Sequence, residues 1–187
     1  MLKNTTSNFG VITKLFHWII ATLVAVQFYL GLWAVWVLPQ NSPKLELYIG
    51  KLHEPIGILV FILGTLAILW MLINPHPLFP NSMLLWEKIV ARITHMLLYL
   101  ALLLMPITGI IMAQASGYPP NFFGLYQFPQ LIEKNKDLAN LAFTFHKYIG
   151  YVFLALIILH ILAAFKHHFI DRDNILKRML PGSNSVH

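Results

Sequence analysis

Four long stretches of this chain contain no Asp, Glu, Lys or Arg, and they restrict its fold more than any other feature. The stretches cover residues 15–38, 55–86, 93–132 and 148–165. A helix needs about 20 mostly apolar residues to cross a bilayer, and breaks rich in Pro, Asn, Ser and Gly separate the apolar parts. We therefore predict an all-α integral membrane four-helix bundle with up-down-up-down topology. It forms a single domain over 1–187, with spans over about 13–38, 51–73, 88–115 and 138–169.

The composition agrees with a membrane location. Of the 187 residues, 58% are hydrophobic and 11% are charged, whereas a soluble domain carries about 25% charged residues. A soluble globular enzyme is therefore not expected. Basic residues at the lipid surface account for the net charge of +6, so we expect no nucleic-acid partner.

Four spans place both termini on one side of the membrane, and the basic residues indicate which side. Eight fall on the side of the termini: Lys3, Lys14, Lys88, Arg92, Lys166, Arg172, Lys177 and Arg178. Five fall on the other side: Lys44, Lys51, Lys134, Lys136 and Lys147. Cytoplasmic segments are enriched in Lys and Arg, so we expect both termini to be cytoplasmic.

Histidine and cysteine content narrows the chemistry. The chain has no cysteine, which excludes disulfides, thiolate zinc sites, cysteine-held iron–sulfur clusters and covalent CxxCH haem attachment. It has nine histidines, and five of them fall within the predicted spans: His17, His53, His95, His146 and His160. Ionisable residues inside a membrane span are candidates for function.

Two of these histidines share one face of the fourth predicted helix. His146 and His160 are 14 residues apart, which is about 21 Å along a helix and about 40° short of four full turns. Such an arrangement suits two metal centres near opposite membrane faces. His17 and His53 lie at matching depths, so we expect His17 to pair with His160 and His53 to pair with His146.

Pairs of histidines in a helical bundle, without Cys or paired carboxylates, favour b haem. Zinc prefers three or four ligands around one point. The residue four positions after each paired histidine is small, which leaves room for a flat macrocycle: Ala21, Gly57, Gly150 and Ala164. His95 is followed at this spacing by Tyr99 and is set apart. The alternative is that small residues only let helices approach and histidines hydrogen-bond between helices.

Charged and polar residues surround both predicted pairs. Lys51 and Lys147 flank the outer pair; they would hold haem propionates, attract an anion such as superoxide, or be ordinary interfacial lysines. Near the inner pair lie five candidates for a quinone head-group site, a proton source or propionate binding: Arg92, His95, Lys166, His167 and His168. For His167 and His168 the alternative is a solvated helix end.

Several motifs together resemble the bacterial cytochrome b-561 family. They include Phe16-His17-Trp18, Leu52-His53, Thr94-His95 and Lys166-His167-His168-Phe169, and the run Asp171-Arg172-Asp173-Asn174-Ile175-Leu176-Lys177-Arg178-Met179. The resemblance covers nearly the whole chain and implies a four-helix membrane protein with two non-covalent b haems. It places His17, His53, His146 and His160 at the positions of the haem ligands. A more distant similarity is to the cytochrome b subunits of membrane hydrogenases.

The resemblance implies a protein of the bacterial inner membrane that transfers electrons between membrane quinone and the periplasm. One branch of the family oxidises superoxide and reduces ubiquinone, which would make this chain an oxidoreductase. The alternative is an electron-carrier subunit that serves a partner oxidoreductase or a periplasmic redox protein. A structural or transport protein without haem is a more remote alternative.

Overall fold

A computed structural model describes residues 1–37, 39, 44 and 48–182. Its four long helices are α1 (Val11–Trp36), α3 (Glu54–Leu72), α4 (Leu85–Ser116) and α5 (Lys136–Phe169). One turn of π-helix, η1 (Ile49–His53), leads into α3. A two-stranded hairpin, β1 (Asn121–Phe122) and β2 (Tyr126–Gln127), lies between α4 and α5, and a short helix, α6 (Ile175–Met179), follows α5.

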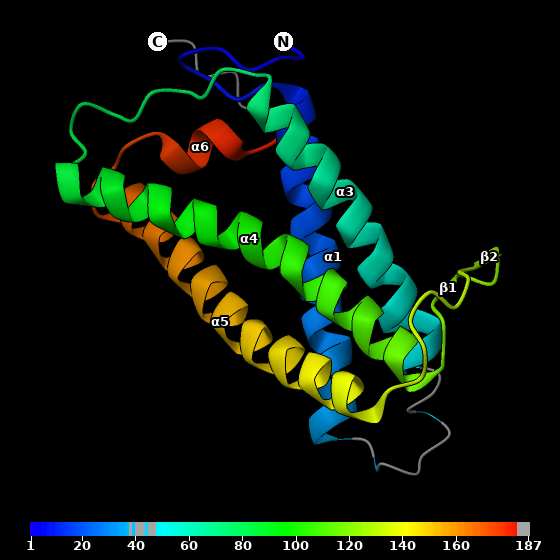
Figure 1. Cartoon of the computed structure of the whole chain (residues 1–187). Helices are drawn as coiled ribbons and strands as arrows, with labels where there is room; N and C mark the ends of the chain where they lie inside the picture. The colour runs from blue at the N-terminus through cyan, green and yellow to red at the C-terminus, as the bar shows by residue number, and fades with distance from the viewer. Residues whose placement is uncertain (38, 40–43, 45–47, 183–187) are drawn as a thin grey trace.

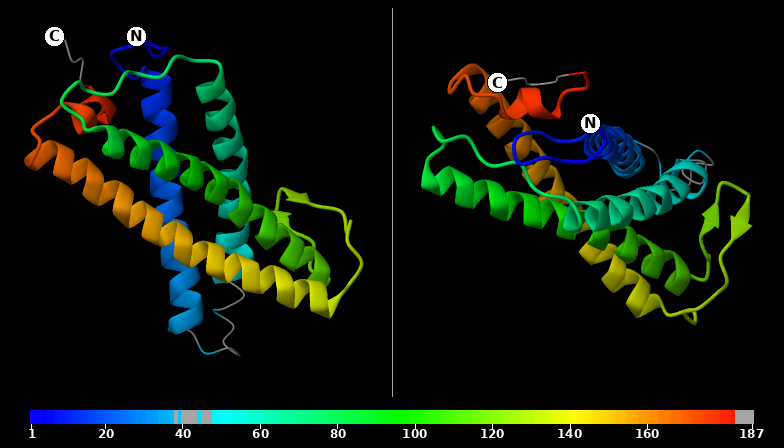
Figure 2. Two further views of the ribbon diagram at one scale, coloured as in Figure 1. Left: turned by 60° about the vertical axis from the view of Figure 1, so that its left-hand side comes forward. Right: turned by 90° about the horizontal axis from the view of Figure 1, so that it is seen from above.

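The four long helices are apolar and long enough to cross a membrane, with η1 and α3 forming one span of 24 residues. This confirms the predicted fold class. Helices α4 and α5 lie antiparallel along each other and cross α1 and α3 at an angle (Figures 1 and 2). The N-terminal segment and α6, the last described helix, lie at the same end of the bundle (Figure 1). We call this end of the bundle the terminal end. We call the opposite end, where η1 and the hairpin begin, the loop end.

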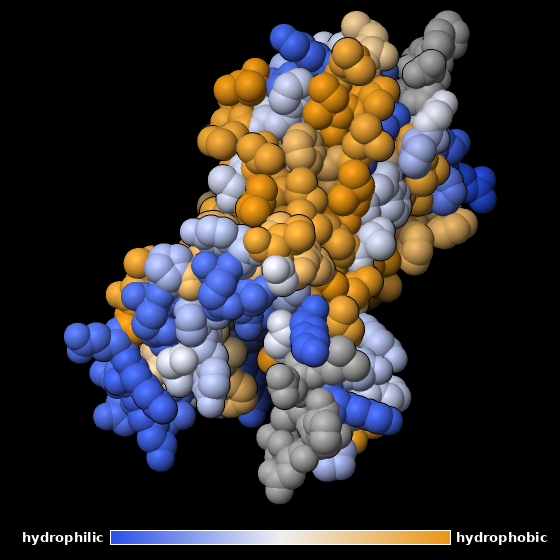
Figure 3. All heavy atoms as spheres, turned by 90° about the vertical axis from the view of Figure 1, so that its right-hand side faces the viewer, coloured by the Kyte–Doolittle hydropathy of each residue, from blue (hydrophilic) through white to orange (hydrophobic). Residues whose placement is uncertain are grey.

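Apolar side chains meet in the middle of the bundle, where the helices cross. The buried cluster contains Ile20, Val24, Val60, Leu102 and Phe153. Many other large apolar side chains remain exposed on the long helices, and they form a broad apolar surface (Figure 3). Because lipid replaces water around a span, these exposed side chains are on the surface that faces the bilayer.

Local signals explain where the helices start and stop. Glu87 accepts a hydrogen bond from the Leu84 backbone N–H (2.9 Å) at the start of α4, which satisfies one free donor of the first turn. Gly117 ends α4 in the left-handed region, with φ of 83°, where glycine carries no steric penalty. Asn135 accepts from the Leu138 N–H (3.0 Å) at the start of α5.

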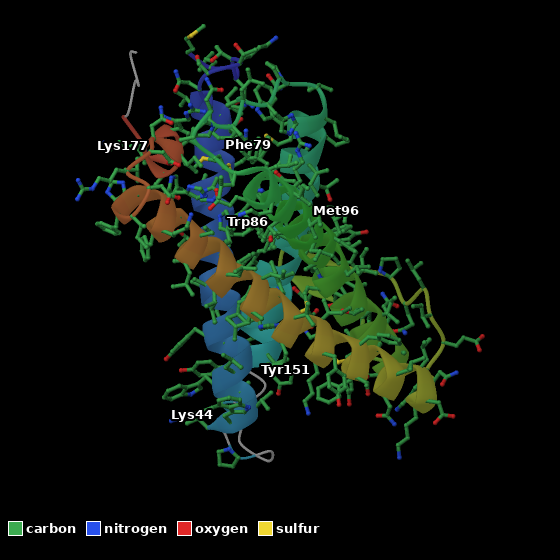
Figure 4. All side chains as sticks on the ribbon, turned by 90° about the vertical axis from the view of Figure 1, so that its left-hand side faces the viewer. Lys44, Phe79, Trp86, Met96, Tyr151 and Lys177 are labelled. Atoms are coloured by element: carbon green, nitrogen blue, oxygen red, sulfur yellow. The ribbon has the colours of Figure 1, made fainter. Side chains whose placement is uncertain are left out.

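At the terminal end, the segment after α5 folds back onto α1. The Trp18 indole donates to the Met179 carbonyl (2.9 Å), and the Lys14 ammonium donates to the Leu180 carbonyl (3.0 Å). Arg178 also donates to the carbonyl of Leu78 (2.7 Å) in the α3–α4 connection. Figure 4 shows that Lys177, on α6, lies at the terminal end, and that Lys44 lies at the opposite end of the molecule.

At the loop end, one buried glutamine holds the connection between α4 and α5. Gln114 is 3% exposed. Its amide nitrogen donates to the Pro129 carbonyl (2.8 Å), and its amide oxygen accepts from the Leu131 N–H (2.8 Å). The returning chain is thus tied to the last turns of α4.

We predict that Gln114→Leu loosens this connection. The backbone groups of Pro129 and Leu131 would lose their partner, and each buried polar group left unpaired costs about 1–3 kcal/mol. The measurements are the thermal unfolding temperature in detergent, which falls, and the rate of protease cleavage within residues 117–135, which rises. The control is Ser116→Ala, because the Ser116 hydroxyl bonds only within α4 as described, to Met112 (2.8 Å). Equal cleavage rates for the two variants would contradict the assignment.

Candidate functional site: two histidine pairs at opposite ends of the bundle

The loop-end pair joins the π-helical turn to α5. His53 ends η1, and its ring centre lies 6.1 Å from that of His146, at an interplanar angle of 72°. Single π-helical turns occur often at functional sites. The 6.1 Å separation shows that the structure brings together the two histidines that were paired from the sequence at this end.

Backbone and hydroxyl groups of α4 orient the His146 ring. Its Nδ1 lies 3.0 Å from the Met105 carbonyl oxygen and 3.0 Å from the Thr108 hydroxyl. A carbonyl oxygen can only accept, so Nδ1 carries the proton and donates to Met105. The tautomer that this bond favours leaves the lone pair of Nε2 available to a metal ion.

Two glycines provide space beside the rings of the loop-end pair. A Cβ placed on Gly31 of α1 would lie 3.3 Å from Cε1 of His53, and one on Gly109 of α4 would lie 3.4 Å from Cε1 of His146. Larger side chains at either position would push the ring aside. Each ring edge thus packs closely against a helix backbone, which a glycine at that position permits.

Gln27 of α1 connects with the backbone of the π-helical turn. Its amide nitrogen donates to the His53 carbonyl (2.9 Å). Its amide oxygen is buried and has no partner among the described residues, and the same holds for Nδ1 of His53. Buried polar atoms are nearly always paired, so these two mark a place where a further polar group would be accommodated.

The terminal-end site contains three histidines. The ring centres of His17 and His160 are 6.2 Å apart, and Trp18 packs edge-on against His17 at 5.0 Å. His95 also comes close, with its ring centre 5.2 Å from that of His160. The side chains of His17 and His160 are half-buried, whereas that of His95 is exposed.

Ring separations distinguish the pairs. Metal–imidazole bonds are about 2.0–2.1 Å long, so two imidazoles on opposite sides of one metal ion have ring centres roughly 6.3 Å apart. The His17–His160 and His53–His146 separations match this value. The 5.2 Å between His95 and His160 is too short for such an arrangement, so His95 is a neighbour of the pair.

Two of the four small residues expected to make room for a macrocycle, Gly57 and Gly150, lie against side chains of other helices. A Cβ on Gly57 would lie 2.8 Å from the Gln27 amide nitrogen, and one on Gly150 would lie 3.4 Å from Cε of Met105. These two glycines therefore allow close packing between helices. The glycines that face the histidine rings, Gly31 and Gly109, were missed from the sequence.

A spacing signal in the sequence would have identified those two glycines. Gly31 follows His17 by 14 residues, and Gly109 follows His95 by 14 residues. The same interval separates His146 from His160. Residues 14 apart share roughly one helix face, so α1 and α4 each present a histidine at the terminal end and a glycine at the loop end.

His167 lies in a charged cluster at the end of α5. Its Nδ1 is 2.8 Å from a carboxylate oxygen of Asp173 and 2.9 Å from one of Asp171. The Lys166 ammonium binds the same Asp171 carboxylate at 2.8 Å and also pairs with Glu87. The side chains of His167 and Asp173 are 8% and 7% exposed. Sequence reasoning found Lys166 and His167 and missed their carboxylate partners.

A cavity of about 350 Å³ opens beside this cluster, between the α3–α4 connection and the end of α5. Glu87, Lys166, Asp171 and Asp173 contribute to its lining. Its volume lies within the range of about 300–1,000 Å³ that is usual for small-molecule sites.

The other candidate residues are more scattered. Arg92 lies over the ring of Phe79, with its guanidinium carbon 5.6 Å from the ring centre. His168 packs edge-on against Phe169 at 4.7 Å and is absent from the His167 cluster as described. Lys51 and Lys147 are exposed at the loop end, next in sequence to the histidines of that pair.

Comparisons with known proteins agree with this architecture. The chain is 35% identical over 188 residues to cytochrome b561 homolog 2 of Escherichia coli (strain K12), covering 97% of this chain and 96% of that protein. It is 30% identical to a probable superoxide oxidase CybB of Yersinia pestis, covering 88% and 91%, and 29% identical to cytochrome b561 homolog 1 of Escherichia coli, covering 88% and 92%. Residues 8–182 match the family model of prokaryotic cytochrome b561. The chain therefore belongs to the prokaryotic cytochrome b561 family, whose members are b-haem proteins of membrane electron transport.

Proposed function

We propose that this protein carries electrons across the bacterial inner membrane through two b haems, from a periplasmic donor to membrane ubiquinone. One observation carries the proposal: two histidine pairs lie at opposite ends of the bundle, each with the ring separation of two ligands on one metal ion. The number of haems, their ligands and the two electron partners are all parts of this proposal.

The residues present fit such a group at both ends. His17 and His160 would hold one haem, and His53 and His146 the other. The Met105 carbonyl supports ligation at the loop end, because it holds the His146 ring by Nδ1 and leaves Nε2 free. Gly31 and Gly109 let the two rings pack closely against α1 and α4. Each b haem, when bound, supplies a one-electron carrier.

The distribution of basic residues supports one orientation of the bundle in the membrane, with the terminal end in the cytoplasm. Eight of the 13 Lys and Arg fall on the side of the termini, and the terminal end includes α6 with Lys177 and Arg178. By the positive-inside rule, the terminal end faces the cytoplasm and the loop end faces the periplasm. The His53–His146 pair is then on the donor side.

Superoxide is the donor we favour. Lys51 and Lys147 are exposed beside the loop-end pair, and positive charge at an entry site concentrates anions. The name of the Yersinia pestis relative points to the same substrate. In this reaction two superoxide anions release one electron each and become two molecules of O₂, and one quinone takes up the two electrons and two protons to become quinol.

The terminal end supplies groups for quinone reduction. His95 is exposed and next to His160, so its ring is available to hydrogen-bond a quinone head group. His167 lies one further heptad along α5, held between Asp171 and Asp173 beside an open cavity. Such a cluster can hold protons near the site of quinol formation. Lys166 keeps Asp171 in place, and Arg92 and His168 complete the set of candidates without a contact to the cluster as described.

The ligand assignment predicts which histidine substitutions remove haem. His160→Ala and His146→Ala each remove one ligand and should each lower the haem content from two per chain to one. His95→Ala is the matched control and should retain both. The measurement is the b-type absorption of the purified protein, per chain, together with reduced-minus-oxidised spectra. Two haems in His160→Ala would refute the pairing, and a wild-type protein without any b-type band would refute haem binding.

The donor assignment predicts a charge effect at the loop end. Stopped-flow mixing with superoxide should reduce the wild-type haems rapidly, and Lys51→Gln/Lys147→Gln should slow this step about three- to tenfold at low ionic strength. The difference should shrink at high salt, because salt screens the charges. Lys134→Gln/Lys136→Gln removes the same charge at the same end and serves as the control. Slow reduction of the wild type would favour the electron-carrier alternative.

A quinone role for His95 predicts a split between the two half-reactions. His95→Phe should keep both haems and their fast reduction by superoxide, but should slow their reoxidation by ubiquinone about 10- to 100-fold, as expected for loss of a positioned hydrogen-bonding group. The readout is haem absorbance after quinone is added to the reduced protein. Unchanged reoxidation would show that His95 does not contact the quinone.

A further inference from the structure

The hairpin between α4 and α5 has an exposed apolar tip that electron transfer does not use. Phe122 and Tyr126 face each other across the two strands. Beside them Leu125 is 83% exposed, Tyr126 is 56% exposed and Phe123 is 46% exposed. We propose that this hairpin anchors the loop end in the membrane interface, with its tip among the lipid head groups of that leaflet.

The position of the hairpin supports this. It turns back beside α3, at a level along the bundle that α1 still occupies (Figures 1 and 2). Seen from above, it projects outward from the helices (Figure 2). Because α1 is long enough to span the membrane, a segment beside it at this level lies within reach of lipid.

The composition of the hairpin suits that location. Residues 93–132 include no Asp, Glu, Lys or Arg, so inserting the tip moves no charge out of water. Its aromatic rings pack edge-on in pairs, Phe122 with Phe123 and Tyr126 with Phe128, each at 5.0 Å. Aromatic side chains are enriched at the membrane–water interface. The side of the molecule that carries the hairpin shows a broad apolar area, with hydrophilic residues gathered toward its lower end and others at its top and upper edge (Figure 3).

The hydrogen bonds of the hairpin indicate how deep the tip lies. The Asn121 side chain accepts from the Gly124 N–H (2.6 Å) and donates to the Gln127 side chain (2.8 Å), and the Phe128 N–H donates to the Pro120 carbonyl (2.9 Å). Many polar groups are thus satisfied internally. Strands of two residues still leave outer edges that the bilayer core could not satisfy, so the depth is that of the head groups.

The base of the hairpin is fixed to the bundle. The Asn121 N–H donates to Glu54 in the first turn of α3 at 2.8 Å, and Gln114 holds the returning strand. Phe123 and Gly124 turn the chain with φ of 54° and 75°. Because the tip is already ordered, insertion requires little loss of conformational freedom.

The absence of cysteine permits a direct test with single-site labels. Leu125→Cys carries a nitroxide in the full-length, haem-loaded protein in phosphatidylethanolamine–phosphatidylglycerol vesicles. Collision rates are measured with O₂, which concentrates in lipid, and with a neutral water-soluble nickel chelate. Glu133→Cys, in the same connection, is the water-facing control, and Leu69→Cys, exposed on α3, is the lipid-facing control.

We expect the Leu125 label to collide with nickel roughly tenfold less often than the Glu133 label, because the polar chelate partitions poorly out of water. Its O₂ rate should lie between those of the two controls. Nickel access equal to that at Glu133 would place the tip in water and overturn the proposal. Protection from both reagents would place it against protein, a second copy or a partner, and would overturn it as well.

A second variant separates anchoring from folding. Phe123→Ser/Leu125→Ser removes the apolar tip, and a nitroxide at Tyr126→Cys should then gain nickel access by severalfold relative to the same label in the otherwise unchanged chain. The b-type spectrum reports that both proteins are folded. Unchanged nickel access would show that these two side chains do not hold the hairpin at the interface. Neither readout depends on superoxide or quinone turnover.

Discussion

The regular spacing of side chains along α5 is the constraint on which the rest of the structure depends. One face of this helix carries a histidine of a candidate site or a core phenylalanine at every seventh position: His146, Phe153, His160 and His167. Seven residues turn a helix almost twice around, so all four point the same way at different depths. Phe153 is 6% exposed and packs against Phe28 at 5.7 Å, which makes the level between the two histidines a closed apolar layer.

The facing helices are adapted to this spacing level by level. At the loop end α4 presents Gly109 and α1 presents Gly31, whereas at the terminal end they present His95 and His17. Three histidines therefore meet at the terminal end, whereas two histidines lie beside two glycines at the loop end. The apolar core separates the two ends.

The fold was predictable because its main signal is local. A run of apolar residues without charge specifies a span whatever surrounds it, and the helix ends differ from expectation by three residues at most, as at Leu85. The histidine pairs were predicted from the depth of each histidine in the membrane, because that depth depends only on its position along its own span. That His17 and His53 face α5 as expected reflects the same simple geometry.

Other parts of the site depend on how helices approach and were not predictable in this way. The π-helical turn at His53 and the glycines beside the rings arise from contacts between helices that no single segment specifies. The carboxylates around His167 depend on a reversal of the chain after α5, where Arg172 takes a left-handed conformation with φ of 55°. Of the four small residues expected to make room for a macrocycle, Gly57 lies against Gln27 and Gly150 against Met105; that they make room for a macrocycle stays a prediction.

The position of both ligand candidates on the same helix has a consequence for biosynthesis. His146 and His160 lie on α5, the last of the four long helices in chain order. Neither pair can exist while only the first three helices have entered the membrane, however well they have folded. Haem held by both residues of a pair, as proposed above, can therefore bind in that way only after the fourth span has been synthesised. The segment that bonds to Lys14 and Trp18 follows α5 in the chain, so these contacts at the terminal end form only after α5 has been synthesised.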